Sequence, residues 1–344
     1  MIVLAKSKVF VSGADGFIGS HLVETLVRAG FGVKALAFYN SHGSAGWLDV
    51  LVPEVRNEVE VVFGDVRDPE LVHRLVGSSD FVFHLASLIG IPYSFNAPRS
   101  YIETNVTGTL NICEAALRSD VERLIHVSTS EVYGSACYVP MDEKHRLSAQ
   151  SPYAASKIAA DQLVNSFHAS FNLPVVTIRP FNTFGPRQSL RALIPTIIQQ
   201  ALIGGRPEIR VGSLTPTRDF SFVTDTVGGM VEAINLSAES WDQAQGCTFN
   251  LGSGFEISVL ETIRLICDII ECEAEIVSAG ERVRPNQSEV TRLWSDNRRA
   301  RQYLSWTPQY ADMPGFRVAL AETIDWYRTH SDLIWQKGPG KYVV

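Results

Sequence analysis

The fold can be worked out from one stretch near the N-terminus, residues 9–19, which read VFVSGADGFIG. The first three residues are apolar and β-branched or aromatic, which is typical of a buried strand. Three glycines follow, at the spacing of a turn that leads into a helix. Gly13 can supply the tight turn, Gly16 lets backbone approach a ligand, and Gly19 allows helix and strand to pack closely. Unpaired amide groups at the start of that helix predict a pyrophosphate site. Its predicted residues are Gly13, Gly16, Phe17, Ile18 and Gly19.

The rest of the first half alternates short apolar runs with helical periodicity. Such alternation indicates parallel strands joined by right-handed crossovers. We therefore predict an α/β fold with a doubly wound parallel sheet of the Rossmann type. The predicted strands are residues 9–11, 33–37, 60–63, 81–85, 124–128 and 175–179, and the predicted helices are residues 20–28, 70–76, 104–118 and 154–170.

The pattern changes after about residue 180. Glycine, proline and arginine become frequent, and helical periodicity returns at residues 193–203, 223–236, 259–270 and 316–329. This predicts a smaller, mixed α/β C-terminal part that packs tightly on the first, because no Gly/Ser-rich linker separates them. We predict a dinucleotide-binding domain at 1–180 and a substrate domain at 181–344, with some segments interleaved and the ligand between the two.

The composition limits the kinds of partner. The 344 residues include 30 Lys and Arg against 37 Asp and Glu, a net charge of −7. That balance argues against binding nucleic acid or an anionic membrane through bulk charge, but it allows a small anion held by a few arginines. No apolar run reaches the length of a transmembrane helix. The five cysteines contain no CxxC pair, so we predict buried free thiols, a cytoplasmic protein and no metal site.

The adenosine end of the predicted cofactor site departs from the usual pattern. Residues 37–40, AFYN, follow the second predicted strand, where a carboxylate normally holds the ribose hydroxyls. No arginine stands there to favour a 2′-phosphate, so NAD is preferred over NADP, although this segment does not decide between them. Asp65 follows the third predicted strand and could read the adenine amino group. It could also cap the helix that follows.

A second constellation combines a phenol, an ammonium and a carboxylate. Tyr153 and Lys157 are spaced i, i+4 at the start of a predicted helix, so they share one face. A free phenol has a pKa of about 10, and a nearby cation favours the phenolate, which can take a proton from a hydroxyl. The strand before this helix ends in Thr129, Ser130 and Glu131, and its carboxyl end faces the ligand. These five residues are the catalytic candidates.

Together these motifs resemble the extended short-chain dehydrogenases/reductases of the NAD-dependent epimerase/dehydratase family, which act on nucleotide-linked sugars. The resemblance covers nearly the whole chain and includes HLA at 84–86, NVTGT at 105–109, TSEVYG at 129–134, RPFN at 179–182, GPR at 185–187 and RDF at 218–220. It implies NAD as cofactor and a nucleotide-diphosphate sugar as substrate. It also implies a homodimer formed by the helices at 104–118 and 154–170. The site residues it adds are Val66, Leu85, Ala86 and Asn105 for the cofactor, and Asn182, Arg187, Arg191, Arg218 and Arg284 for the substrate.

The residue pair Ser130-Glu131 bears on the reaction. The resemblance implies that Glu131 occupies the position of the base that removes the C5 proton in sugar 4,6-dehydratases, so we predict dehydration. Many of these enzymes carry Asp-Glu here, so Ser130 leaves open which group acts as the acid for the departing hydroxyl. The motifs around Tyr153, Asn182 and Arg218 look like those of dehydratases acting on UDP- or GDP-linked N-acetylglucosamine. Decarboxylation of a nucleotide-linked glucuronate, 4-epimerisation and a non-catalytic dinucleotide sensor or scaffold are the alternatives.

Overall fold

The computed structural model describes residues 7–202, 206–279 and 290–332. A seven-stranded parallel sheet forms its centre, in the order β10-β6-β5-β4-β1-β2-β3. The strand order reverses beside β1, which gives the doubly wound topology that the sequence predicts. In such sheets a crevice forms at this switch point, here at the carboxyl ends of β1 and β4. The strands are β1 (Lys8–Ser12), β2 (Gly32–Phe38), β3 (Val59–Gly64), β4 (Phe81–His84), β5 (Arg123–Val127), β6 (Val175–Pro180) and β10 (Thr248–Leu251).

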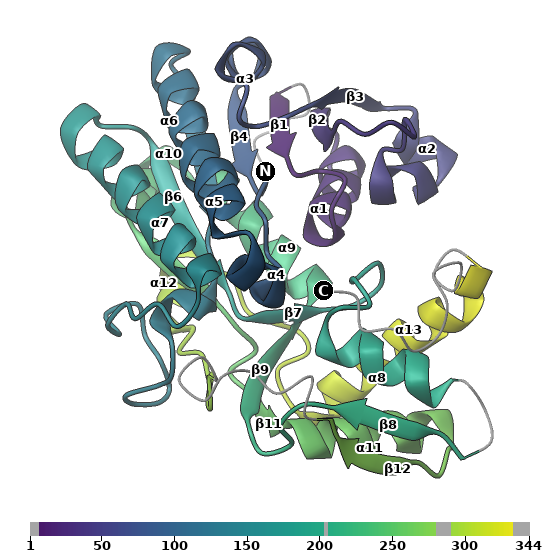
Figure 1. Cartoon of the computed structure of the whole chain (residues 1–344). Helices are drawn as coiled ribbons and strands as arrows, with labels where there is room; N and C mark the ends of the chain where they lie inside the picture. Colours follow the sequence, from purple (N-terminus) through teal and green to yellow (C-terminus); the bar gives the residue numbers. More distant parts are fainter. Residues whose placement is uncertain (1–6, 203–205, 280–289, 333–344) are drawn as a thin grey trace.

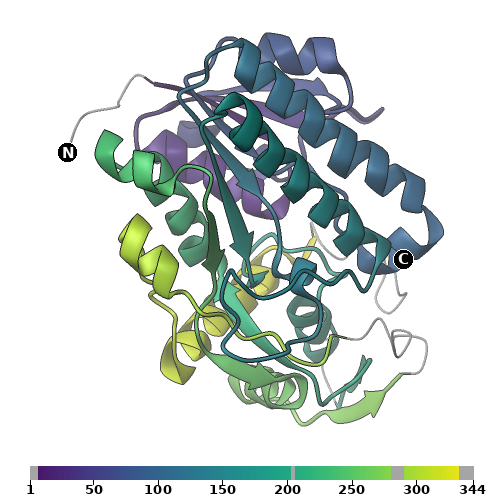
Figure 2. The ribbon, with the colours of Figure 1, turned by 90° about the vertical axis from the view of Figure 1, so that its left-hand side faces the viewer.

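Helices cover both faces of this sheet, as Figures 1 and 2 show. The helices α3 (Pro69–Val76), α6 (Gly108–Arg118) and α7 (Pro152–Phe171) lie on one face, and α1 (Phe17–Arg28) and α9 (Val223–Ile234) lie on the other. Side chains alternate along a strand, so β1 serves both layers. Val9 and Val11 pack into the core under α1, whereas Phe10 packs with Leu71 and Ile112 under α3 and α6.

The C-terminal part adds two small sheets and further helices. One sheet joins β11 (Glu256–Ser258), β9 (Thr217–Phe222) and β7 (Asn182–Phe184), and the other pairs β12 (Glu275–Ser278) with β8 (Glu208–Val211). Their helices are α8 (Leu193–Ala201), α11 (Val259–Ile270) and α13 (Met313–Thr329), while α10 (Ala238–Ala244) and α12 (Arg298–Leu304) lie near β10 and α9. Because β10 is a strand of the large sheet and α9 packs on one of its faces, the chain beyond residue 180 contributes to both parts. The division at residue 180 stays a prediction.

The helices and strands predicted from the sequence are present, but the structure also contains short helices and turns that were not predicted. The missed elements include η1 (Gly46–Val50), α2 (Pro53–Arg56), α4 (Ile91–Asn96), α5 (Pro98–Tyr101), a π-helical turn η2 (Ile102–Thr107) and the single turn η3 (Ser130–Tyr133). All five cysteines are free, but the prediction of buried thiols is confirmed only for Cys113, because Cys137 is exposed and Cys247, Cys267 and Cys272 are partly exposed. Among the described residues, no helix is both long and apolar enough to cross a bilayer.

Candidate active site

The glycine turn has the shape that a phosphate group needs. Gly13 has φ +69°, and a Cβ there would lie 2.7 Å from the backbone nitrogen of Ala86. A Cβ on Gly19 would overlap the carbonyl oxygen of Gly13. Within the described chain, no side chain caps the start of α1, whose N-cap residue is Gly16. The first amide groups of α1, from Phe17, Ile18 and Gly19, are therefore placed to bind an anion, as the helix dipole also favours.

The end of β4 forms the opposite wall of this turn. The backbone amides of Leu85 and Ala86 both donate to Ser12 Oγ at 3.2 Å. Asn105, in the π-helical turn, fixes the chain that follows. Its side chain accepts a hydrogen bond from the Leu88 amide at 2.8 Å and donates to Ser156 Oγ at 2.9 Å. Asn105 is therefore a link between the loop after β4 and α7, buried below the predicted cofactor site.

Two carboxylates lie at the predicted adenosine end of the site. Asp15, inside the glycine turn, accepts a hydrogen bond from the Phe38 amide at 3.1 Å and so joins the turn to the end of β2. Asp65 pairs with Arg67 at 2.6 Å, and the hydrogen bond from Arg67 lowers the pKa of Asp65. Asp68 caps α3, so Asp65 does not. Val66 is buried against Gly108.

Tyr153 and Lys157 are buried on one face of α7, with 7% and 3% of their surface exposed. Lys157 Nζ donates to the carbonyl of Val127, the last residue of β5, at 2.8 Å. Burial raises the pKa of the Tyr153 phenol, and its hydrogen bond with Thr129 offsets part of that rise. Burial also lowers the pKa of Lys157 to about 8. Lysine therefore remains mainly charged at neutral pH, while the phenol is protonated in this state.

The turn after β5 brings Glu131 to the same place. Thr129 Oγ1 accepts a hydrogen bond from the Glu131 amide at 3.2 Å, which closes the turn η3. The carboxylate of Glu131 lies close enough to Tyr153 to act on the pKa of the phenol, after the larger effects of burial and Thr129. Ser130 is 2% exposed within this turn. The carboxyl end of β5 thus brings together Thr129, Glu131, Tyr153 and Lys157. The sequence predicts this for a site with two proton acceptors, a phenol and a carboxylate.

The predicted substrate residues lie in different surroundings. Arg187, at φ +68°, pairs with Glu24 of α1 at 2.6 Å. Arg191 is exposed, and its charge lowers the pKa of Tyr101, although burial and Tyr93 raise that pKa by more. The ring of Tyr101 in turn contacts that of Tyr153, with centroids 6.2 Å apart. The Arg187 guanidinium is therefore directed to α1, whereas that of Arg191 is near enough to Tyr101 to affect the pKa of its hydroxyl.

The remaining two described substrate candidates lie on β7 and β9. Arg218 is buried and donates to the carbonyl of Thr217 at 2.8 Å. Asn182 has a buried Oδ1 that accepts no hydrogen bond from any described residue. A buried amide oxygen without a donor is costly, which fits a ligand group that supplies one. Arg284 lies outside the described residues.

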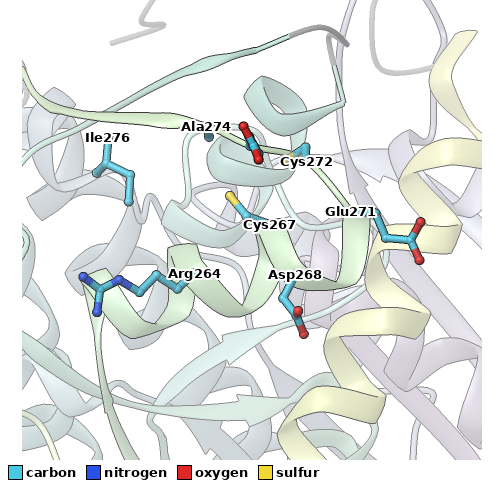
Figure 3. A pocket seen from close by; sticks show the side chains of 8 residues that line it. Arg264, Cys267, Asp268, Glu271, Cys272, Ala274 and Ile276 are labelled. Carbon is cyan, nitrogen blue, oxygen red and sulfur yellow. The ribbon is translucent and has the colours of Figure 1, made fainter.

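A separate hollow opens on the C-terminal part, between α11 and β12 (Figure 3). Its volume is about 550 Å³, and none of the predicted site residues lines it. Three carboxylates face it, which disfavours a diphosphate. Its lining residues are Arg264, Cys267, Asp268, Glu271, Cys272, Glu273, Ala274 and Ile276.

A doubly wound sheet with a glycine turn, an aligned tyrosine and lysine, and a hydroxyl-rich strand end defines a dinucleotide-dependent enzyme of the short-chain dehydrogenase/reductase class. Residues 10–315 match the model of the GDP-mannose 4,6 dehydratase family, and the chain belongs to this family. This confirms the resemblance drawn from the sequence motifs.

The individual relatives include both 4-epimerases and 4,6-dehydratases of nucleotide sugars. The UDP-glucose 4-epimerase of Mycolicibacterium smegmatis is 33% identical and aligns with 94% of this chain and 99% of its own length. The dTDP-glucose 4,6-dehydratase of Streptomyces venezuelae, solved with NAD bound, has a TM-score of 0.81 at 27% identity, covering 95% of this chain and 98% of that one. The UDP-N-acetylglucosamine 4-epimerase of Methanobrevibacter ruminantium has a TM-score of 0.81 at 27% sequence identity. The match covers 94% of this chain and 99% of that one.

Proposed function

We propose that this protein is an NAD-dependent nucleotide-sugar 4,6-dehydratase that acts on UDP- or GDP-linked N-acetylglucosamine. The observation that carries the proposal is the position of Glu131 beside Thr129 and Tyr153. Epimerisation at C4 needs one base for the C4 hydroxyl. Dehydration needs a second base to remove the C5 proton, and a carboxylate next to the tyrosine can serve as that base.

The residues that would hold NAD fit it on structural grounds. The glycine turn leaves no room for side chains, and the start of α1 has no side-chain cap. The amides of Phe17, Ile18 and Gly19 would bind the pyrophosphate, and Asp65 would accept from the adenine amino group. When bound there, NAD would supply an acceptor for the hydride of C4 and, in its reduced form, a donor of hydride for C6.

The chain's own groups move the protons. Tyr153 would act as the phenolate, the form that the charged Lys157 favours, and would become the neutral phenol when it takes the proton of the C4 hydroxyl as the C4–H bond breaks. A ketone at C4 acidifies the C5 hydrogen, which Glu131 removes as the C6–O bond breaks. Because Ser130 replaces the usual acid, we assign protonation of the leaving hydroxyl to Glu131 as well. When hydride returns to C6, C5 takes a proton from water through Glu131, and Tyr153 releases the proton of the C4 hydroxyl, so one water is lost and no net oxidation occurs.

Side chains from the part of the chain after residue 180 would hold the substrate. Arg191 and Arg218 would contact the diphosphate, since guanidinium groups match phosphate oxygens. Asn182, with its unpartnered oxygen, would accept a hydrogen bond from the sugar or nucleotide. The N-acetylglucosamine moiety is supported by the motif resemblance and by a relative that acts on UDP-N-acetylglucosamine. A cytoplasmic homodimer remains part of the proposal.

Mass spectrometry of products separates the candidate reactions. The protein is incubated with UDP-N-acetylglucosamine, GDP-N-acetylglucosamine, UDP-glucose, dTDP-glucose and UDP-glucuronate. Loss of one water without accumulation of NADH supports dehydration. Loss of carbon dioxide, or an unchanged mass with inverted C4, contradicts it and identifies a decarboxylase or the 4-epimerase that the 33% identical relative exemplifies. Bound NAD without turnover of any of these sugars would indicate the sensor or scaffold.

A further inference from the structure

Asp161 is a buried carboxylate that the chemistry above does not use. It lies one helical turn after Lys157 on α7 and is 1% exposed. Its Oδ1 is 3.1 Å from Nε2 of His126 on β5. Its Oδ2 accepts from Nε and Nη2 of Arg179 on β6, at 3.2 and 2.9 Å. Asp161 therefore fastens α7 to two neighbouring strands.

One arm of this network ends at Lys157. The Lys157 ammonium donates to the carbonyl of Val127, and Val127 directly follows His126 in β5. Lys157 and Asp161 share a helix, and their two partners are adjacent in one strand. The bond between Asp161 and His126 consequently fixes the carbonyl that holds the ammonium.

The other arm leads to the turn that carries Glu131. Arg179 Nη1 donates to the hydroxyl of Tyr133 at 3.0 Å, and that hydroxyl donates to Asn250 Oδ1 at 2.7 Å. Tyr133 is the last residue of η3, the turn that contains Glu131. The same carboxylate is thus linked, through one arginine, to the second predicted base.

The charges in this cluster depend on Asp161. Burial lowers the pKa of His126, so its ring is neutral at neutral pH and directs an Nε2–H at the carboxylate. Its Nδ1 is buried and meets no partner in the described chain. Burial alone would raise the pKa of Asp161, but the bond from His126 and the cations Arg179 and Lys157 bring it to about 2. Asp161 therefore stays ionised between two buried cations.

Other titratable groups lie close to this cluster, and His84 is near enough to His126 and Lys157 for both to lower its pKa, after the larger effect of burial. Burial lowers the pKa of His84 on β4, which leaves that ring neutral as well. Glu131 on η3 and Tyr101 on α5 act on the pKa of Tyr153, after burial and Thr129. In the described parts of α4, α6 and η2, no charged side chain hydrogen-bonds to Lys157. The carboxylate that opposes the effect of burial on the pKa of Lys157 is Asp161.

We propose that Asp161 is a positioning residue, which keeps Lys157 charged and in place by balancing two buried cations and by tying β5 and β6 to α7. Only the measurement of activity rests on the proposed function. The NMR titration described next needs neither substrate nor turnover.

The direct test is a titration of Lys157 by NMR in protein labelled with ¹³C at lysine Cε. The chain has seven lysines, so the spectrum is simple, and Lys157→Met assigns the signal. In Asp161→Asn the pKa of Lys157 should fall by about one pH unit or more, since the nearest carboxylate is lost. Asp161→Glu should restore most of it. Asp225→Asn is the matched control, because this buried carboxylate binds the amides of Gln309 and Tyr310 instead.

An unchanged Lys157 pKa in Asp161→Asn would overturn the inference. Asp161→Asn leaves Arg179 without its carboxylate partner. If this prevents folding, Arg179→Gln is compared with the double variant Arg179→Gln/Asp161→Asn, and the same fall in the pKa of Lys157 is expected. On any substrate that the wild type turns over, Asp161→Asn should lower kcat more than it changes KM, and should move the alkaline limb of the pH profile to lower pH. Turnover with an unmoved limb contradicts the inference. A shifted pKa without turnover of any nucleotide sugar supports it and contradicts the proposed function.

Discussion

The glycine turn between β1 and α1 offers a ligand almost only backbone groups. Around β7 and β9, in contrast, the direction of each arginine side chain depends on the side chains next to it. At the turn, Gly13 and Gly19 leave no space for a Cβ, and the ligand-facing groups are amides. Near β7, two arginines four residues apart have different surroundings. Arg187 pairs with Glu24, whereas Arg191 is exposed and acts on the pKa of Tyr101 through its charge.

This contrast separates two kinds of specificity. Backbone amides at a helix start bind any pyrophosphate, so they suit a cofactor shared by many enzymes. Arginine side chains can be redirected by a single neighbour, so they suit a site that must vary with the substrate. We therefore expect substitutions at the turn to abolish cofactor binding altogether, and substitutions among the arginines to give graded effects on the substrate.

The largest effect is expected from Gly19→Ala. The added Cβ would overlap the Gly13 carbonyl oxygen, and both are backbone positions that cannot move without opening the turn. NAD binding should fall below detection in calorimetry, and turnover should vanish. Gly32→Ala is the control, because a Cβ there meets nothing closer than 3.9 Å. Binding of NAD to Gly19→Ala at the wild-type affinity would show that the turn does not hold the pyrophosphate.

Glu131→Gln should have the next largest effect and should leave the cofactor side intact. The amide keeps the size of the side chain but cannot remove a proton, so loss of water should slow by about 100-fold or more. NAD affinity should match that of the wild type. Glu103→Gln, on the exposed side of η2, is the control and should retain turnover. Water loss at an unchanged rate in Glu131→Gln would exclude this residue as the C5 base.

The strand, turn and helix of the predicted cofactor side could be predicted from the sequence because their determinants are local. The spacing of Gly13, Gly16 and Gly19 and the strand before them lie within one short segment. The same applies to Tyr153 and Lys157, which one helical turn aligns. Parallel strands then bring the ends of β1, β4 and β5 to one edge without any detail of side-chain packing.

Side-chain partners distant in sequence are harder to predict. The ion pair of Arg187 joins residues 163 positions apart, and nothing in the residues beside Arg187 identifies Glu24 as its partner. Asp161 was also missed, because its partners His126 and Arg179 lie on two other strands. Its spacing of four residues from Lys157 was the one available signal, and that spacing is also common on ordinary amphipathic helices.

The two arginines of the substrate side can be compared directly. Arg191→Ala should raise KM for the nucleotide sugar about tenfold, the effect of one charge-assisted hydrogen bond. Arg187→Ala should instead lower the melting temperature, and Glu24→Gln should reproduce most of that loss, because the two side chains form one pair. Thermal unfolding and steady-state kinetics of the three variants check this. A tenfold rise in KM for Arg187→Ala with unchanged stability would return Arg187 to the substrate site.

The smallest effect is expected from Asp65→Asn, at the exposed edge of the cofactor side. Its carboxylate is predicted to accept a hydrogen bond from the adenine amino group, and the loss of one such exposed bond should weaken NAD binding about fivefold. Asp65 also holds Arg67, so Arg67→Gln is the informative control. It removes the ion pair and leaves the carboxylate available, and NAD affinity should then equal or exceed that of the wild type. Equal losses in Asp65→Asn and Arg67→Gln would mean that the ion pair, and not adenine recognition, is the contribution of Asp65. In that case this edge of the cofactor side would depend on side-chain pairing, as the substrate side does.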